Sequence, residues 1–289
     1  MPEKLYLNGN YTAVKKAKIS VFDRGFMFGD GVYEVIPVYS GKLFRSEGHL
    51  ARLQHSLDAI DIPNPLTTLQ WIEIFSTLIE HNFPSVDSVI YLQITRGTME
   101  KRDHAWPPDM QPNVLVTSTE QVYAKQDSAT AGAKAVTLDD TRWSDCHIKT
   151  INLLANALLH QEARNQGANE AILIREGFAI EGSQSNLFIV RDDIVITPPK
   201  NRHMLGGITR EIVLELCQQN KIICSEKNIR EDDLHQANEI WLSSATREIL
   251  PIVTLNQHAV GKGRPGVIWQ QIIQLYHEYK FNLIRTPDD

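Results

Sequence analysis

The sequence has few cysteines, and their arrangement suggests neither a covalent nor a metal-based scaffold. Among the 289 residues there are three cysteines, Cys146, Cys217 and Cys224. An odd number does not fit a disulfide framework, and this spacing does not fit a zinc site. We therefore expect no bound metal, and the simplest interpretation is a protein of the reducing cytoplasm.

Long apolar runs and basic tracts are also missing. No window approaches the roughly 18 consecutive apolar residues of a membrane-spanning helix, so no membrane partner is expected. The N-terminus, Met1–Leu5, lacks the basic start and apolar centre of a signal peptide. A formal net charge of −6 argues against nucleic acid as a partner. The content of 42% hydrophobic and 22% charged residues is typical of a soluble globular protein.

Apolar periodicity predicts a mixed α/β chain in two parts. We place an N-terminal α/β domain at residues 1–118, a small polar linker at 119–131 and a C-terminal domain at 132–289. The patterns predict strands near 4–7, 12–14, 35–39, 42–44, 89–96, 114–117, 133–138, 171–174, 178–180, 187–190, 222–225 and 239–242. They predict helices from about 46, over 67–82, over 151–165, after 210, near 231–236 and over 266–283.

Lys149 is the most distinctive residue of the chain. It follows a strand-like run and precedes an amphipathic helix pattern that starts near Ile151, with Thr150 as the expected N-cap. A helix N-terminus carries partial positive charge and disfavours an ammonium, which would favour a neutral, nucleophilic amine. A surface lysine at a loop–helix junction is the commoner alternative. In the helix that follows, Leu154, Ala157, Leu158 and Glu162 lie near helical spacing.

Four residues of the first domain are candidates for an anion site or a pocket wall. Tyr33 ends a stretch of glycines and aromatics that could form either a core turn or a pocket wall. Arg102 and His104 are two apart, so on an extended segment they would face the same way and could bind a carboxylate together. A solvated charged loop is the alternative. Arg52 lies off the apolar stripe of its helix and by itself reads as a solvated charge.

The second domain offers a carboxylate and two small-residue segments. Glu181 ends an apolar strand, so it is either exposed or held by a specific positive partner. Gly206–Arg210 leads into a helix pattern, which gives either a phosphate site or an ordinary capped turn. Ser243–Thr246 places small hydroxyl residues at a strand end, where they could cap a helix or contact an anion.

A reactive lysine, a carboxylate downstream and two anion sites match what pyridoxal phosphate requires. With these motifs the chain resembles the D-amino-acid (D-alanine) aminotransferases, fold-type IV pyridoxal-phosphate enzymes of the branched-chain aminotransferase class. The matching motifs cover nearly the whole chain in order: Asp23-Arg24-Gly25, Phe28–Glu34, Thr95–Thr98, Arg102-x-His104, Ile148-Lys149 with Asn152–Leu154, Glu181–Asn186 and Gly207–Arg210.

The resemblance implies a role for each candidate residue. Lys149 would form the Schiff base and move the proton, and Glu181 would pair with the pyridine nitrogen. Phosphate would be bound by Arg52, Ile208 and Thr209. Gly207 would also bind the cofactor, Leu205 would pack on its ring, and Ser185 would lie near it. Tyr33, Arg102 and His104 would hold the substrate α-carboxylate, the last two from the partner subunit of a homodimer. Ala245 stands where the family often has a phosphate-binding threonine, and Thr246 is one position off.

The same resemblance implies a two-domain fold with the cofactor between a smaller N-terminal α/β domain and a C-terminal domain with a barrel-like sheet. The expected reaction transfers the amino group of D-alanine to 2-oxoglutarate and gives pyruvate and D-glutamate. Within the fold, the alternatives are a branched-chain L-amino-acid aminotransferase or an aminodeoxychorismate lyase. A non-catalytic protein that uses only the phosphate site is the alternative of another class. Cys146 and His147 have no role that the sequence explains.

Overall fold

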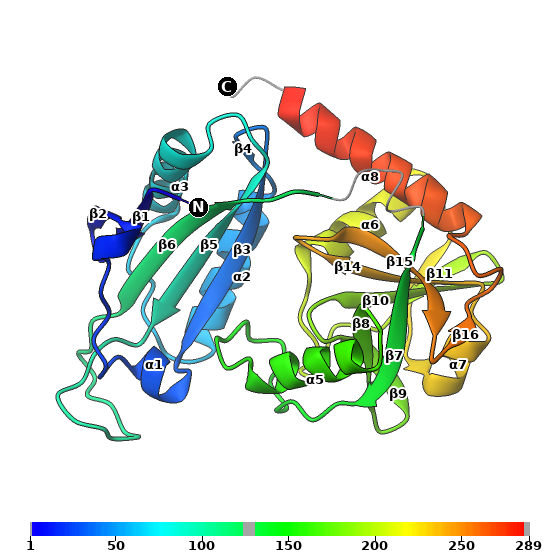
Figure 1. Ribbon diagram of the computed structural model, residues 1–289, viewed down its shortest axis with the longest axis horizontal. Coiled ribbons are helices and arrows are strands. Elements are labelled where there is room, and N and C mark those ends of the chain that lie inside the picture. Colours follow the sequence, from blue (N-terminus) through cyan, green and yellow to red (C-terminus); the bar gives the residue numbers. More distant parts are fainter. Residues whose placement is uncertain (1, 124–130, 286–289) are drawn as a thin grey trace. The chain divides into compact units, whose positions relative to one another are not determined.

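The computed structural model describes residues 2–123 and 131–285. Contacts divide the chain into two compact units (Figure 1): unit 1 is Met1–Val122 with Ile148–Leu153, and unit 2 is Tyr123–His147 with Leu154–Asp289. Our division of the sequence put Ile148–Leu153 in the second domain, but this segment contacts unit 1.

The predicted linker, residues 119–131, overlaps a strand at its start, and part of it lies outside the described residues. Strand β6 continues through Glu120, so the first two positions of the linker belong to a strand. Positions 124–130 of that linker lie outside the described residues.

Unit 1 is built on a six-stranded sheet with the order β2-β1-β6-β5-β3-β4, and every neighbouring pair is antiparallel. Its strands are β1 (Lys4–Leu7), β2 (Asn10–Ala13), β3 (Gly31–Tyr39), β4 (Lys42–Leu43), β5 (Ser88–Thr95) and β6 (Asn113–Glu120). Its helices are the 3-10 turn η1 (Val14–Lys16), α1 (Arg24–Phe28), α2 (Ser46–Asp58) and α3 (Thr68–Asn82).

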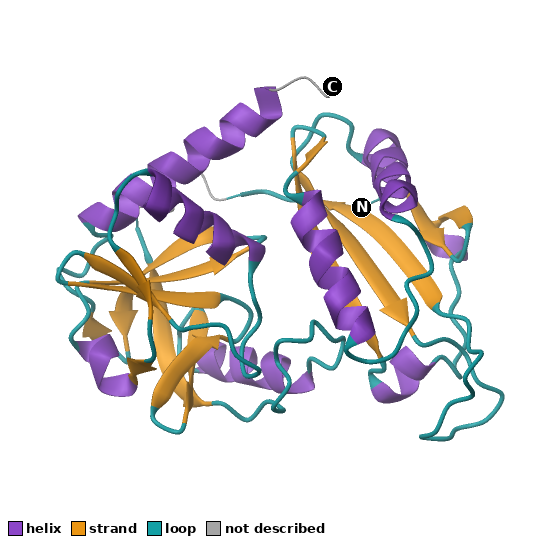
Figure 2. Ribbon diagram, turned by 180° about the vertical axis from the view of Figure 1, so that it is seen from behind, coloured by secondary structure: helices purple, strands orange, loops and turns teal. Residues whose placement is uncertain are grey.

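Helices α2 and α3 pack against the sheet of unit 1 (Figure 2). Alternate residues of β3 and β5, such as Ile36 and Ile90, are fully buried beneath them, as expected when one face of a strand meets a helix layer. Helix α3 starts where the sequence predicts, because Thr67 and Gln70 form a capping box.

Unit 2 is built on a ten-stranded sheet with the order β12-β11-β10-β14-β15-β7-β8-β9-β13, and β16 pairs with β15. Its strands are β7 (Ala133–Asp139), β8 (Glu170–Arg175), β9 (Phe178–Gly182), β10 (Asn186–Arg191), β11 (Ile194–Thr197), β12 (Cys224–Glu226), β13 (Ile229–Arg230), β14 (Glu239–Ser244), β15 (Glu248–Leu255) and β16 (His258–Ala259). Its helices are α5 (Leu154–Asn165), α6 (Ile208–Gln219), α7 (Glu231–His235) and α8 (Val267–Arg285).

The sheet of unit 2 curls, because β9 contacts β10 in addition to its ladder partners (Figure 2). The predicted mixed α/β fold with a barrel-like second sheet is therefore confirmed. Among the described residues, no helix combines the length and the apolar character needed to cross a membrane.

The buried residues of the helix after Lys149 differ from those that the sequence places near helical spacing. Helix α5 begins at Leu154 and buries Leu159 and Ala163 against β7 and β8. Leu154 and Leu158, two of the residues near helical spacing, are 69% and 62% exposed. The apolar residues of this helix form two adjacent stripes, and only contact with the sheet decides which stripe is buried.

Candidate functional site

Lys149 lies in a short extended segment that pairs with β3. Tyr33 N donates to Lys149 O at 3.0 Å, and Thr150 forms an antiparallel bridge with Val32. The predicted N-cap role of Thr150 is therefore wrong, since α5 begins only at Leu154. The edge of β3 has backbone groups free to form hydrogen bonds. The backbone of Lys149 and Thr150 pairs with this edge, so its hydrogen bonds are made without an earlier start of α5.

This pairing places the side chain of Lys149 beside that of Tyr33. Residues opposite each other in an antiparallel pair project to the same face. Lys149 Nζ lies 4.3 Å from the centre of the Tyr33 ring, and the Tyr33 and Tyr91 rings are 5.9 Å apart. Burial and the neighbouring Tyr33 raise the pKa of Tyr91 to about 12, so this phenol stays protonated at neutral pH. The structure thus brings two of the predicted site residues together.

Arg52 is not the solvated charge that its helix position suggests. Its Nε and Nη2 donate to the two carboxylate oxygens of Glu34 at 2.7 and 2.8 Å, and His49 Nδ1 lies 2.8 Å from the same carboxylate. Burial alone would raise the pKa of Glu34, but Arg52 and His49 hold it well below its usual range. The bidentate contact fixes the plane of the Arg52 guanidinium.

The loop after β5 brings Arg102 and His104 to one aromatic ring. Arg102 Cζ is 5.0 Å and the His104 ring is 5.3 Å from the centre of the Phe28 ring. Both side chains are exposed. The buried Arg24 donates to Asp103 O at 2.7 Å and to His104 O at 2.9 Å, and so holds the loop backbone. Sequence analysis gave Arg24 no role of its own.

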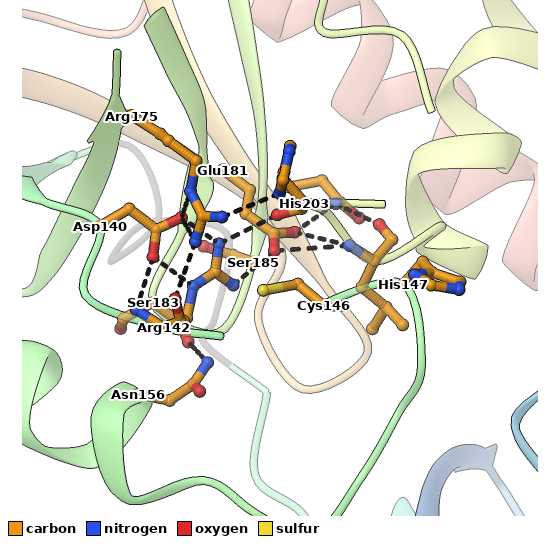
Figure 3. A network of polar contacts seen from close by, with 12 residues as sticks. Asp140, Arg142, Cys146, His147, Asn156, Arg175, Glu181, Ser183, Ser185 and His203 are labelled. Atoms are coloured by element: carbon orange, nitrogen blue, oxygen red, sulfur yellow. Dashed lines mark hydrogen bonds and ion pairs between the residues drawn. The ribbon is translucent and has the colours of Figure 1, made fainter. Parts of the chain in front are cut away.

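Glu181 is buried at the end of β9 and accepts hydrogen bonds from three groups (Figure 3). Arg142 Nη1 donates at 2.6 Å, Asn186 Nδ2 at 3.1 Å and Leu205 N at 3.2 Å. Burial raises the pKa of Glu181 to about 6, although Arg142 and Leu205 act in the opposite direction. Of the two possibilities left open by the sequence, the structure selects the carboxylate held by a specific cation.

Asp140 and Arg175 extend the network of polar contacts around Arg142 (Figure 3). Arg142 Nε and Nη2 donate to the two oxygens of Asp140 at 2.9 and 3.0 Å, and Arg175 Nη2 lies 3.0 Å from Asp140. Burial would raise the pKa of Asp140, but Arg142 and Arg175 hold it below its usual range. Sequence reasoning missed Arg142 and Asp140: a buried acid at position 181 requires a cation, but no local spacing identifies it.

Ser185 follows Glu181 in the same turn and contacts another buried carboxylate, that of Glu170. Glu170 accepts from Ser183 Oγ, from Ser185 Oγ at 3.4 Å and from Arg247 Nη1 at 3.0 Å. Arg247 immediately follows the small-residue segment after β14. Glu170 therefore ties the turn after Glu181 to the end of β14.

The start of α6 has the properties of an anion site. Gly207 is the N-cap, and no side chain caps the helix. A Cβ at this glycine would lie 1.9 Å from Asn186 Oδ1, so a side chain there would displace Asn186. The first N–H groups of a helix without a side-chain cap, together with its dipole, favour a bound anion. Ile208 and Thr209, both buried, occupy this first turn.

The end of β14 adds hydroxyl groups to the same unit. Ser243 pairs with Asn186 in the sheet. In the part of the chain that the structure describes, the buried Oγ atoms of Ser243 and Ser244 have no hydrogen-bond partner. A buried hydroxyl without a partner is costly unless a ligand satisfies it. The resemblance pointed to Ala245, which has no side-chain oxygen, and did not identify Ser244.

The residues of unit 2 fit the cofactor that the resemblance implies. A buried carboxylate suits a pyridine nitrogen, and the uncapped α6 packs on β14 near the hydroxyls without partners.

Comparison with known proteins assigns the family. Residues 31–255 match the model of amino-transferase class IV. D-alanine aminotransferase from Bacillus licheniformis is 35% identical over 269 residues, which cover 93% of this chain and 94% of the relative. The Staphylococcus aureus (strain MSSA476) protein of the same name is 36% identical over 278 residues, which cover 96% and 98%.

Solved structures agree on the fold. The branched-chain amino acid aminotransferase of Escherichia coli has a TM-score of 0.90 at 24% identity, covering 96% of this chain and 94% of that one. That of Thermoproteus uzoniensis, with norvaline, has a TM-score of 0.86 at 26% identity over the same shares. With the family model matching most of its length, this chain belongs to class IV of the aminotransferases, which depend on pyridoxal phosphate.

Proposed function

We propose that this protein is a D-amino-acid aminotransferase that transfers the amino group of D-alanine to 2-oxoglutarate, giving pyruvate and D-glutamate. The relatives named D-alanine aminotransferase, 35% and 36% identical over nearly their whole length, support this substrate class. The observation that carries the proposal is the buried Glu181, held by three donors in the same unit as the uncapped α6.

The residues of the chain divide the chemistry between them. Pyridoxal phosphate, when bound, supplies an electron sink for the substrate Cα. Lys149 would hold the cofactor and would move the proton of the substrate Cα. Glu181 keeps the pyridine nitrogen protonated. The phosphate is bound by Arg52, Ile208 and Thr209, with Ser244 in the place that Ala245 cannot fill.

Selection of the D-isomer is assigned to the α-carboxylate site. Arg102 and His104, which meet at the Phe28 ring, would hold the carboxylate together with Tyr33, with the Cα–H directed at Lys149. The guanidinium of Arg102 and the imidazole of His104 suit a substrate carboxylate. In an L-specific enzyme the apolar side chain of the substrate would lie against them instead, which they suit less well. The branched-chain enzymes remain the alternative within the fold.

The absorbance spectrum of the purified protein tests the function directly. We expect a long-wavelength band from the lysine-linked cofactor that disappears on addition of D-alanine and persists with L-leucine. Loss of the band with L-leucine alone would favour the branched-chain alternative. A protein without this band after incubation with pyridoxal phosphate would instead be a non-catalytic phosphate binder.

We further propose a homodimer in which Arg102 and His104 serve the site of the partner subunit. Substitution Arg102→Ala then lowers kcat/KM for D-alanine about 10- to 100-fold, the effect of losing one charge-assisted hydrogen bond. Mixing subunits of Arg102→Ala and Lys149→Ala restores about a quarter of the wild-type activity, since half of the dimers each carry one intact site.

The matched control for this mixing experiment combines Lys149→Ala with Glu181→Gln. These two residues serve the same subunit's site in the proposal, so no mixed dimer contains an intact site. Restoration in this control, or none in the first mixture, contradicts the assignment of Arg102 to the partner's site.

A further inference from the structure

Glu181 belongs to a buried network of four oppositely charged side chains. Asp140 and Glu181 are the acids, and Arg142 and Arg175 are the bases, so the formal charges cancel. Arg142 contacts both acids, and its side chain is 5% exposed. Neither acid contacts solvent freely, with side-chain exposures of 0% for Asp140 and 4% for Glu181.

Arg142 is the only cation bonded to Glu181 among the described hydrogen bonds and ion pairs. The other donors to this carboxylate, Asn186 Nδ2 and Leu205 N, are neutral. Removal from water favours the protonated acid, and a neighbouring guanidinium favours the carboxylate. A protonated Glu181 could not hold a proton on the pyridine nitrogen, so its charge state matters for the chemistry.

Asp140 offsets the charge of Arg142 and fixes its orientation. The bidentate contact holds the guanidinium plane and leaves Nη1 directed at Glu181. Arg175 supports Asp140, and its Nη1 donates to His203 Nδ1 at 2.8 Å. Without Asp140, the full charge of Arg142 would repel a protonated pyridine ring.

Two further titratable groups lie near this network: His203, whose Nδ1 accepts from Arg175, and Cys146. Burial raises the pKa of the Cys146 thiol to about 11, so the thiol is neutral at physiological pH. Its Sγ donates to Trp143 O at 3.1 Å and not to Glu181. Burial is the main cause that raises the pKa of Glu181, and of its charged neighbours Arg142 lowers this pKa while Asp140 raises it.

We propose, building on the function above, that Arg142 is a positioning residue that keeps Glu181 ionised and oriented toward the pyridine nitrogen, with Asp140 tuning its effect. Arg142 acts through Glu181 and does not touch the substrate in this assignment. The proposal predicts that removing the arginine and removing the aspartate move the titration of Glu181 in opposite directions.

The test is a carboxyl ¹³C NMR titration of Glu181 in the full-length protein labelled with [δ-¹³C]glutamate, with Glu181→Gln to assign the signal. Substitution Arg142→Met moves the midpoint upward by about 1 to 3 pH units, since a carboxylate next to an arginine is normally lowered by that amount. The near-isosteric Asp140→Asn moves it downward. Arg191→Met, which removes an arginine paired with Asp233 at the surface, leaves it unchanged.

Opposite shifts in the two variants support the proposal, because general loosening of the fold would move both the same way. Equal shifts, or none, overturn it. Because the titration needs no cofactor, its result tests the role of Arg142 independently of the aminotransferase activity. In the loaded enzyme, the acidic limb of the kcat/KM profile for D-alanine moves in the same directions as the NMR midpoints.

Discussion

Substitution Lys149→Ala lowers kcat/KM for D-alanine by at least about 10⁴-fold, because it removes the group proposed both to hold the cofactor and to move the Cα proton. General acid–base catalysis alone accounts for about 10²- to 10⁴-fold. The measurement is steady-state transamination, together with the absorbance spectrum, in which the band of the lysine-linked cofactor is absent.

The matched control is Lys200→Ala, which removes a half-exposed lysine paired with Glu211 and changes kcat/KM less than about twofold. Small primary amines added to Lys149→Ala restore part of the activity, since they supply the missing base. A Lys149→Ala protein that folds normally and keeps more than a few per cent of the activity contradicts the role of Lys149.

Substitution Glu181→Gln lowers kcat/KM for D-alanine by about 10²- to 10³-fold, as expected for loss of a preorganised electrostatic group. The pH dependence of cofactor binding gives a second test of Glu181. Because burial raises the pKa of Glu181 to about 6, the wild-type carboxylate becomes protonated below that pH. We therefore expect cofactor affinity to fall on the acidic side of about pH 6.

The phosphate of the cofactor also titrates near pH 6, so the variant is needed to separate the two effects. Cofactor binding measured from pH 5 to 8 falls less steeply in Glu181→Gln than in the wild type, because only the phosphate titration is left. Identical pH profiles would show that Glu181 stays in one charge state throughout.

The regular elements could largely be read from local pattern. The helix expected at 67–82 is α3, capped by Thr67, and the strand expected at 89–96 is β5. Capping residues and apolar periodicity act within a few positions of the chain, and they survive in the folded protein. Burial of these elements then follows from their apolar faces.

The surroundings of Lys149 could not be read in this way. Thr150 looked like a helix cap, but its backbone pairs with Val32 of β3, and α5 starts later. Helix α5 buries Leu159 and leaves Leu158 exposed, which the spacing of its apolar residues did not indicate. Strand pairing joins segments far apart in sequence, and its hydrogen bonds override a local capping preference.

The kinds of reactive group and their order along the chain could be read from the amino-acid sequence: a lysine, a downstream carboxylate and a helix start that follows a glycine. Only the tertiary structure decided their partners, placing Arg142 against Glu181, Glu34 against Arg52 and Asn186 against Gly207. A charge becomes costly only when folding removes it from water. The partner that stabilises it is then whichever residue the fold brings within hydrogen-bonding distance, and sequence spacing does not record that.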